Sequence, residues 1–243
     1  MSDYPHLTRA PITEAVIDMR VALPPGTSLA DLEPFSDVVK DEYPEVAAIR
    51  AHEAQFDFNG ATATTTFQEI GKIYWTADRS RAVQSRLSGF TFSQVKNYDS
   101  FDAMLKASTV LWEKYRVVAR PTQVTRCALR FINRLAVEPG VDLNDVLVTN
   151  PTIADDLQAS INEYFTKVAM AFGDNRHAVV TQLLPPPSAT GGDALILDID
   201  VFTDRMSIAP DSHEMWREFE VLRDLKNRCF FNSLNTKAVE GYL

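Results

Sequence analysis

TQVTRCALRFINRLAV, residues 122–137, is the stretch that decides the fold. Its apolar and β-branched residues alternate with polar ones, and this pattern predicts a long β-strand. Arg126, Arg130 and Arg134 recur at a spacing of four, so a regular strand places all three on one face, with consecutive arginines about 13 Å apart. The opposite face is core-like and carries Cys127, Leu129, Phe131 and Leu135.

A second strand of the same kind is predicted near the start of the chain, in ITEAVIDMRVAL, residues 12–23. Glu14 and Asp18 share one face of this strand, at the same spacing as the arginines. If the two strands pair, Glu14 and Asp18 are expected to meet Arg130 and Arg126. The sequence therefore predicts structural ion pairs between the two leading strands.

The rest of the first half predicts a short helix, an antiparallel meander and a long helix. The short helix spans residues 28–43 and is capped near Ser28, with Pro34 in an early turn or a kink. The long helix begins at Asp99 or Ser100 and ends before Pro121. Turn signals, including Asn59-Gly60 and Gly71, divide the meander into strands at 51–58, 61–67, 72–77 and 81–92.

The second half repeats this order of elements. After the strand at 122–137 comes a loop or weak helices, and a final helix is capped by Asp211 or Ser212. Between them, strands are predicted at 162–172, 176–184 and 193–203.

Together these elements predict an α+β fold with a largely antiparallel sheet and helices on one face. We expect one domain, residues 1–243, built of two related halves, 11–120 and 121–235, each running strand, short helical segment, meander and long helix. This order is similar to that of the saddle-shaped TATA-binding protein, an analogy of order alone. The alternative is a tandem α+β structure of unrelated halves.

The charge balance argues against broad binding to nucleic acid or to a membrane surface. The chain has 33 acidic and 24 basic side chains, a formal net charge of -9, whereas such binding normally needs a basic surface. No apolar run approaches the roughly 20 residues of a membrane span, and no secretory signal is recognised. Cys127 and Cys229 are expected to be reduced thiols in a cytoplasmic protein.

The arginine row supports two interpretations. It can form a ladder of ion pairs that fixes the strand register, or it can bind an anion, because guanidinium groups match phosphate and carboxylate geometry. The ladder is favoured for Arg126 and Arg130. Arg134 has no evident acid opposite it in the sequence, so it is the arginine expected to reach a ligand, with Asn133 beside it.

Asp198 and Asp200 form a weaker candidate site on the strand LILDIDVF. They lie on one face about 7 Å apart, and paired carboxylates can bind a divalent cation or divide acid and base roles. No histidine or third acid stands at a convincing spacing, and no catalytic motif occurs in the chain. The favoured interpretation is that both aspartates form ion pairs with the arginine row or face water. No metal or cofactor is expected.

The chain resembles a sporadically distributed family of uncharacterised bacterial proteins of about this length. The resemblance rests on a Pro-Ile-x-Glu-Ala-Val opening, here Pro11 to Val16, and on a Thr-Arg-x-x-x-Arg-Tyr-Ile-Asn-Arg strand, here Thr125 to Arg134 with Phe131 in place of the tyrosine. It implies a patchily inherited bacterial protein, carried with mobile or defence genes, with no assigned activity. It also implies that the family pattern includes Glu14, Arg126, Arg130, Asn133 and Arg134.

Three hypotheses for function follow. The first is a non-enzymatic binding or interaction module whose arginine-bearing sheet face engages an anionic small molecule or a protein partner. The second is a metal-dependent enzyme on a phosphorylated or nucleotide-like substrate, with Asp198 and Asp200 as cation ligands. The third is nucleic-acid binding on a saddle-shaped sheet, which the net charge disfavours. A homodimer formed through a strand edge or a long helix is the default expectation for the assembly.

Overall fold

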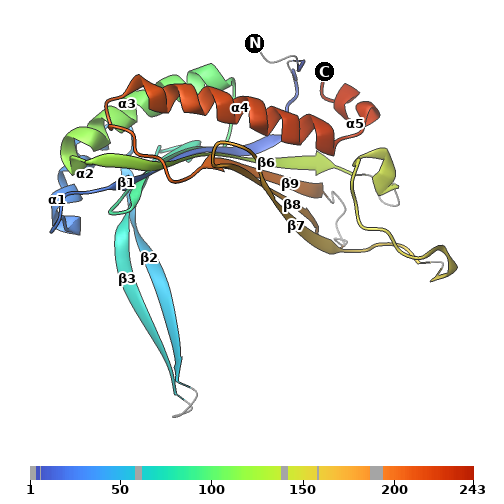
Figure 1. Cartoon of the computed structure of the whole chain (residues 1–243), viewed down its shortest axis with the longest axis horizontal. Helices are drawn as coiled ribbons and strands as arrows, with labels where there is room; N and C mark the ends of the chain where they lie inside the picture. Colours follow the sequence, from blue (N-terminus) through green and yellow to red (C-terminus); the bar gives the residue numbers. More distant parts are fainter. Residues whose placement is uncertain (1–3, 6, 58–61, 138–141, 158, 187–193) are drawn as a thin grey trace. The chain divides into compact units, whose positions relative to one another are not determined.

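The computed structural model describes the chain except residues 1–3, 6, 58–61, 138–141, 158 and 187–193, and it describes no side chains at 52–57, 62–66 and 155. The fold is α+β, with one antiparallel sheet of nine strands in the order β2-β3-β4-β5-β1-β6-β9-β8-β7 (Figure 1). The strands are β1 (Ile12–Ala22), β2 (Glu45–Asp57), β3 (Thr62–Trp75), β4 (Arg81–Arg86), β5 (Gly89–Gln94), β6 (Gln123–Ala136), β7 (Tyr164–Ala171), β8 (Arg176–Leu184) and β9 (Ala194–Thr203).

The helices alternate with groups of strands along the chain. They are α1 (Leu29–Leu32), α2 (Pro34–Val39), α3 (Phe101–Ala119), α4 (His213–Ser233) and α5 (Thr236–Glu240), with short 3-10 turns at Leu143–Asp145 and Asp155–Leu157. Among the described helices, none is long and apolar enough to cross a membrane.

The chain forms two compact units, which are described separately. The 17–126 unit comprises Ile17–Arg126 and Met206–Ser212. The 127–243 unit comprises Met1–Val16, Cys127–Arg205 and His213–Leu243. Strands β1 and β6 contribute residues to both units, and the division into related halves at 11–120 and 121–235 stays a prediction.

In the 17–126 unit, helix α3 covers one face of the sheet. The predicted cap is confirmed, because the Ser100 hydroxyl accepts a hydrogen bond from the Ala103 N–H. The apolar positions of α3 are buried against the strands, with Phe90 of β5 in contact with the rings of Trp112 and Tyr115. We call the opposite side of this unit's sheet, which carries Asp18, Arg86 and Thr91, its open face.

Three boundaries differ from the sequence prediction. Gly71 does not end a strand but lies inside β3, beside a register shift at Ile49/Arg50. Residues 81–92, expected as one strand, fold back on themselves as β4 and β5. The helix expected at 28–43 divides into α1 and α2, with Pro34 at the first position of α2, where its missing N–H costs no helical hydrogen bond.

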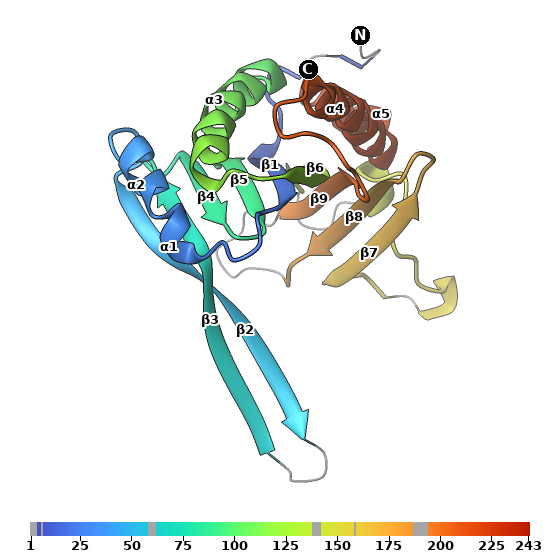
Figure 2. The same cartoon turned by 60° about the vertical axis from the view of Figure 1, so that its left-hand side comes forward.

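Strands β2 and β3 extend beyond the rest of their unit as a two-stranded ribbon (Figures 1 and 2). They pair from Glu45 with Trp75 to Asp57 with Thr62, whereas β4 pairs only with the Gly71–Trp75 end of β3. The outer part of the ribbon is therefore a hairpin without a third strand.

In the 127–243 unit, β6, β9, β8 and β7 form an antiparallel sheet in that order, and α4 packs on β9 and β8. Four of the five inner positions expected from helical spacing are buried in α4, namely Met215, Phe219, Leu222 and Leu225; the fifth, Cys229, is half-buried, and Phe230 is buried in its place. The predicted strands 162–172, 176–184 and 193–203 correspond to β7, β8 and β9.

Candidate functional site

A row of arginines and glycines crosses four neighbouring strands of the 17–126 unit. Arg86 of β4 lies opposite Gly71 of β3 on one side and opposite Gly89 of β5 on the other. Gly89 in turn lies against the backbone of Arg20 in β1. The row is therefore Gly71, Arg86, Gly89, Arg20, and the two arginines stand two strands apart, about 10 Å between their Cα atoms.

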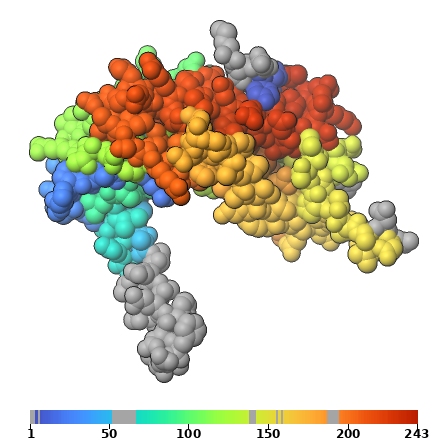
Figure 3. Space-filling model, viewed as in Figure 1, coloured from blue at the N-terminus to red at the C-terminus, as the bar shows by residue number. Residues whose placement is uncertain are grey.

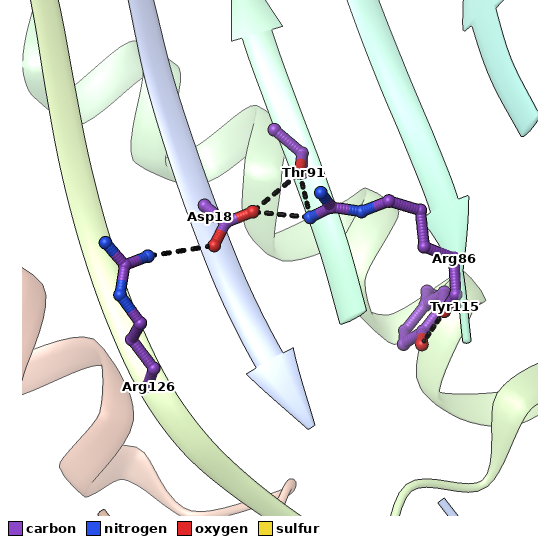
Figure 4. A network of polar contacts seen from close by, with 5 residues as sticks. All are labelled: Asp18, Arg86, Thr91, Tyr115 and Arg126. Atoms are coloured by element: carbon purple, nitrogen blue, oxygen red, sulfur yellow. Dashed lines mark hydrogen bonds and ion pairs between the residues drawn. The ribbon is translucent and has the colours of Figure 1, made fainter. Parts of the chain in front are cut away.

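Asp18 holds the Arg86 side chain in place on the open face (Figure 4). One Asp18 oxygen, Oδ2, accepts hydrogen bonds from Arg86 Nη2 at 2.5 Å and from the Thr91 hydroxyl at 2.8 Å. The other, Oδ1, lies 3.1 Å from Nη1 of Arg126. Since the three charged side chains are only 15–20% exposed, this cluster is largely shielded from water, and its charge-assisted bonds are strong.

The two glycines exist because the backbones approach too closely for a side chain. A Cβ at Gly89 would stand 2.0 Å from the Met19 carbonyl oxygen, and Gly89 has a φ of +149°, which L-residues rarely adopt. A Cβ at Gly71 would stand 2.3 Å from the Ser85 carbonyl oxygen and 2.8 Å from the Arg86 Cα. At Gly71 the Arg86 side chain also comes close, since its Cγ would stand 2.8 Å from the added Cβ, so glycine at this position lets the Arg86 side chain lie over β3.

Arg20 differs from its neighbours in having no polar contact. It follows Asp18 by two residues, so the strand alternation puts it on the same open face, whereas Met19 is buried on the other. Arg20 is exposed, and among the described residues it makes no side-chain hydrogen bond or ion pair. Its guanidinium group is available to a ligand.

Tyr115 supports the site from the helical side. Its hydroxyl donates a 2.9 Å hydrogen bond to the backbone carbonyl of Arg86. Burial raises the pKa of the Tyr115 hydroxyl, so it stays a neutral donor at physiological pH. The bond ties the end of β4, where Arg86 lies, to α3.

The ion pair predicted between Asp18 and Arg126 is confirmed, but Arg130 has a different partner from the one predicted. In the 127–243 unit, Arg130 binds Asp198 of β9 with two guanidinium nitrogens, at 2.9 and 2.6 Å. The hydrogen bond that Arg130 donates to Asp198 raises the pKa of Arg130, with further contributions from the charges of Asp198, Asp200 and Glu14. Glu14 thus interacts with Arg130 only through the electrostatic attraction of its charge, whereas Asp198 binds Arg130 directly.

Two further candidates from the sequence are corrected. Asn133 cannot join an arginine-lined surface, because it is 1% exposed and lies on the buried side of β6, where it donates to the Leu197 carbonyl. Arg134 is exposed, but it has an interaction in the structure, so the lack of a partner no longer distinguishes it. Arg20 has that property in the described chain, as do Arg50, Arg120, Arg205 and Arg217, and of these it is Arg20 that follows Asp18 by two residues on the same face of β1.

The candidate cation site at Asp198 and Asp200 gains no support. Asp198 is occupied by the bidentate contact with Arg130, as the favoured interpretation had it. The described residues contain no group of three or more histidine, cysteine or acidic side chains that could hold a metal ion.

Lys226 of α4 is a titratable group that the sequence did not single out. Its Nζ lies 4.3 Å from the centre of the Phe131 ring, and burial lowers its pKa to about 8 from the ordinary 10.5. Between these two values the unfolded chain binds more protons than the folded chain, so stability should rise with pH.

We expect Lys226→Met to abolish this rise, because methionine fills the same space without a charge. Urea denaturation at pH 7, 8, 9 and 10 measures it. Lys106→Met, which removes an exposed lysine from α3, should leave the slope of the wild type unchanged. A slope that survives in Lys226→Met would show that another group titrates.

Sequence reasoning missed Arg20, Arg86 and Thr91. A signal for Arg20 was present, since it follows Asp18 at the spacing that puts side chains on one face. The sequence gives no signal for Arg86, because its position depends on the turn between β4 and β5, which lies inside the single strand predicted at 81–92. A scan against models of known protein families and a search of curated proteins found no match to this chain, and the family resemblance at 11–16 and 125–134 stays a prediction.

Proposed function

We propose that the chain is a binding module that holds a small anionic group, a phosphate or a carboxylate, above Gly89 between Arg20 and Arg86. The observation that carries this proposal is Arg20, an exposed guanidinium without a polar contact among the described residues, beside a second guanidinium that Asp18 and Thr91 hold in position. Two guanidinium groups on the same face of a sheet can together bind an oxyanion.

The arrangement of Arg86 supports a binding role over a purely structural one. Its Nε is buried and has no hydrogen-bond partner in the described part of the chain, which is unfavourable for folding. Within that part, its one acidic contact is Asp18, which also receives Arg126. A structural arginine would be expected to satisfy more of its donors.

The experiment is a thermal-shift and calorimetric titration with inorganic phosphate, a nucleoside monophosphate and a dicarboxylate, each compared with chloride at equal ionic strength. We expect at least one of the three to raise the melting temperature of the wild type. Arg20→Gln should weaken that binding about tenfold or more, because it removes a charge-assisted hydrogen bond. Its melting temperature without the anion should stay near that of the wild type.

The matched control is Arg81→Gln, which removes the same charge from the other end of β4, where Arg81 pairs with Glu42. It should bind the anion as the wild type does. No response to any of the three anions, or an equal loss of affinity in both variants, would contradict the proposal.

We also propose that the two halves of the chain are variations on one unit with a saddle-like ancestor. The order of elements supports this: β1, α1 and α2, β2 to β5 and α3 are followed by β6, two 3-10 turns, β7 to β9 and α4. The second half has three meander strands where the first has four. Under this proposal, the β2–β3 ribbon is an elaboration of the first half.

A further inference from the structure

Strand β7 is the outermost strand of its sheet, and none of its side chains is buried. Phe165 is 64% exposed and Val168 is 52% exposed, although the two point to opposite faces. Neighbouring strands are different, since β8 buries Ala178, Val180 and Gln182. This strand of eight residues has exposed apolar side chains on both faces. In the monomer, it is therefore stabilised mainly by its backbone hydrogen bonds with β8.

The helical layer of the 127–243 unit does not reach β7. Helix α4 packs on β9 and β8, and Figure 2 shows β7 beyond it at the edge of the sheet. The space-filling view shows the gold surface around β7 and β8 uncovered beside the orange and red surface of α4 (Figure 3). Val168 is therefore exposed even though it points to the side on which α4 lies.

The free edge of β7 has one of the features that normally keep edge strands apart, a lysine, and lacks the others. Such strands are usually short, bulged, interrupted by proline or protected by inward charges. The sequence YFTKVAMA has no proline and one charged residue, Lys167. Within the described chain, no strand pairs with this edge.

The backbone groups that the edge offers follow from the ladder with β8. The N–H of Phe172 donates to the Arg176 carbonyl at 2.7 Å, so Phe172 belongs to the set that points toward β8. Because residues of an antiparallel ladder alternate between their two neighbours, the odd-numbered residues point outward. The groups at the free edge thus belong to Phe165, Lys167, Ala169 and Ala171.

We propose that β7 pairs with β7 of a second copy of this chain, antiparallel, about a two-fold axis at Val168. The four outward residues are symmetric about Val168, so this register places Lys167 opposite Ala169 of the second copy and Phe165 opposite Ala171. Every outward N–H and C=O of the strand is then paired. The sheet continues from one copy into the next, as in other isologous dimers.

The charge and packing of the strand favour a second copy over a foreign peptide. A register centred on Lys167 would put the two lysines directly opposite each other, whereas the register centred on Val168 puts each beside an alanine. The two Val168 side chains then meet at a pair without mutual hydrogen bonds, where side chains approach most closely. Both the 52% exposure of Val168 and the symmetry of the outward groups are explained by one contact.

The test is sedimentation equilibrium of the full chain, with Ala169→Pro and Ala169→Val compared against the wild type. We expect a wild-type dimer at micromolar concentration. Proline at position 169 removes an outward N–H that β8 does not use, so the monomer should fold while the dimer dissociation constant rises at least about a hundredfold. Ala169→Val keeps the N–H and should keep the dimer.

A second variant covers the case in which Ala169→Pro fails to fold by circular dichroism. Val168→Arg keeps the backbone intact and puts two like charges on the axis, so it should dissociate the dimer at low salt and partly restore it at high salt. A wild type that stays monomeric at about 100 micromolar would overturn the proposal. So would a dimer that both variants leave intact, since that dimer would use another surface.

Discussion

Replacing Asp18 by alanine is expected to lower the free energy of unfolding by about 3 kcal/mol, at the low end for a buried ion pair because the cluster retains some exposure. The change leaves the guanidinium of Arg86, only 20% exposed, without the carboxylate that holds it. It also removes the acceptor of the Thr91 hydroxyl, which lies on a residue 5% exposed. The loss therefore comes mainly from the unsatisfied groups that remain.

Urea denaturation followed by circular dichroism measures this loss, with Asp37→Ala as the matched control. Asp37 pairs with Lys40 at 3.2 Å, but their side chains are 77% and 64% exposed, so the control should cost less than about 1 kcal/mol. Equal losses in the two variants would mean that Asp18 is no more than a surface partner. Asp18→Ala should also release Arg86 from its position and weaken any anion binding at Arg20.

Replacing Gly89 by alanine is expected to destabilise the fold on the order of 3 kcal/mol or more. The added methyl group would overlap the Met19 carbonyl oxygen at 2.0 Å, and neither backbone can yield without breaking the contact of β5 with β1. The φ of +149° adds strain for any L-residue. Thermal and urea denaturation measure the change.

Two other glycines separate the causes. Gly26 has a φ of +84° with no atom within 4 Å of an added Cβ, so Gly26→Ala should cost only the backbone strain, about 1 kcal/mol. Gly173 has no atom within 4 Å of an added Cβ and does not have a positive φ, so Gly173→Ala should be close to neutral. If Gly89→Ala costs no more than Gly26→Ala, the close approach of β5 to β1 does not contribute to the cost, and backbone strain alone explains it.

Much of the fold could be predicted because local signals and tertiary packing agree. Alternation identified β1 and β6, and the capping serine identified the start of α3 at Phe101. The meander was less accessible. Gly71 looks like a turn residue in the sequence, but its function is to let β3 approach Ser85 and Arg86, and a sequence does not distinguish a glycine for a turn from one for close approach.

The ion pairs of the site could be predicted from the sequence only where one neighbouring strand offered an acidic partner. Asp18 meets Arg126 as the spacing indicates. Arg130 had two candidate neighbours, and the partner came from β9, although Glu14 in β1 stood at the matching position. The spacing of residues along a strand determines on which face of the sheet a side chain lies, but it does not determine which neighbouring strand provides the partner of that side chain. The same ambiguity hid Arg86, whose partner Asp18 is 68 residues away in the chain.

The segment Met206–Ser212 gives the 17–126 unit a late dependence on the rest of the chain. It adds a strand-like edge at Val124 and places the Pro210 carbonyl where it accepts a hydrogen bond from the Trp112 indole, 98 residues earlier. During synthesis, the unit that contains Arg20 and Arg86 therefore lacks this segment until residues 127–205 of the other unit have been made. Folding of the 17–126 unit therefore requires contacts between residues far apart in the sequence, and the two units cannot fold one after the other as independent domains.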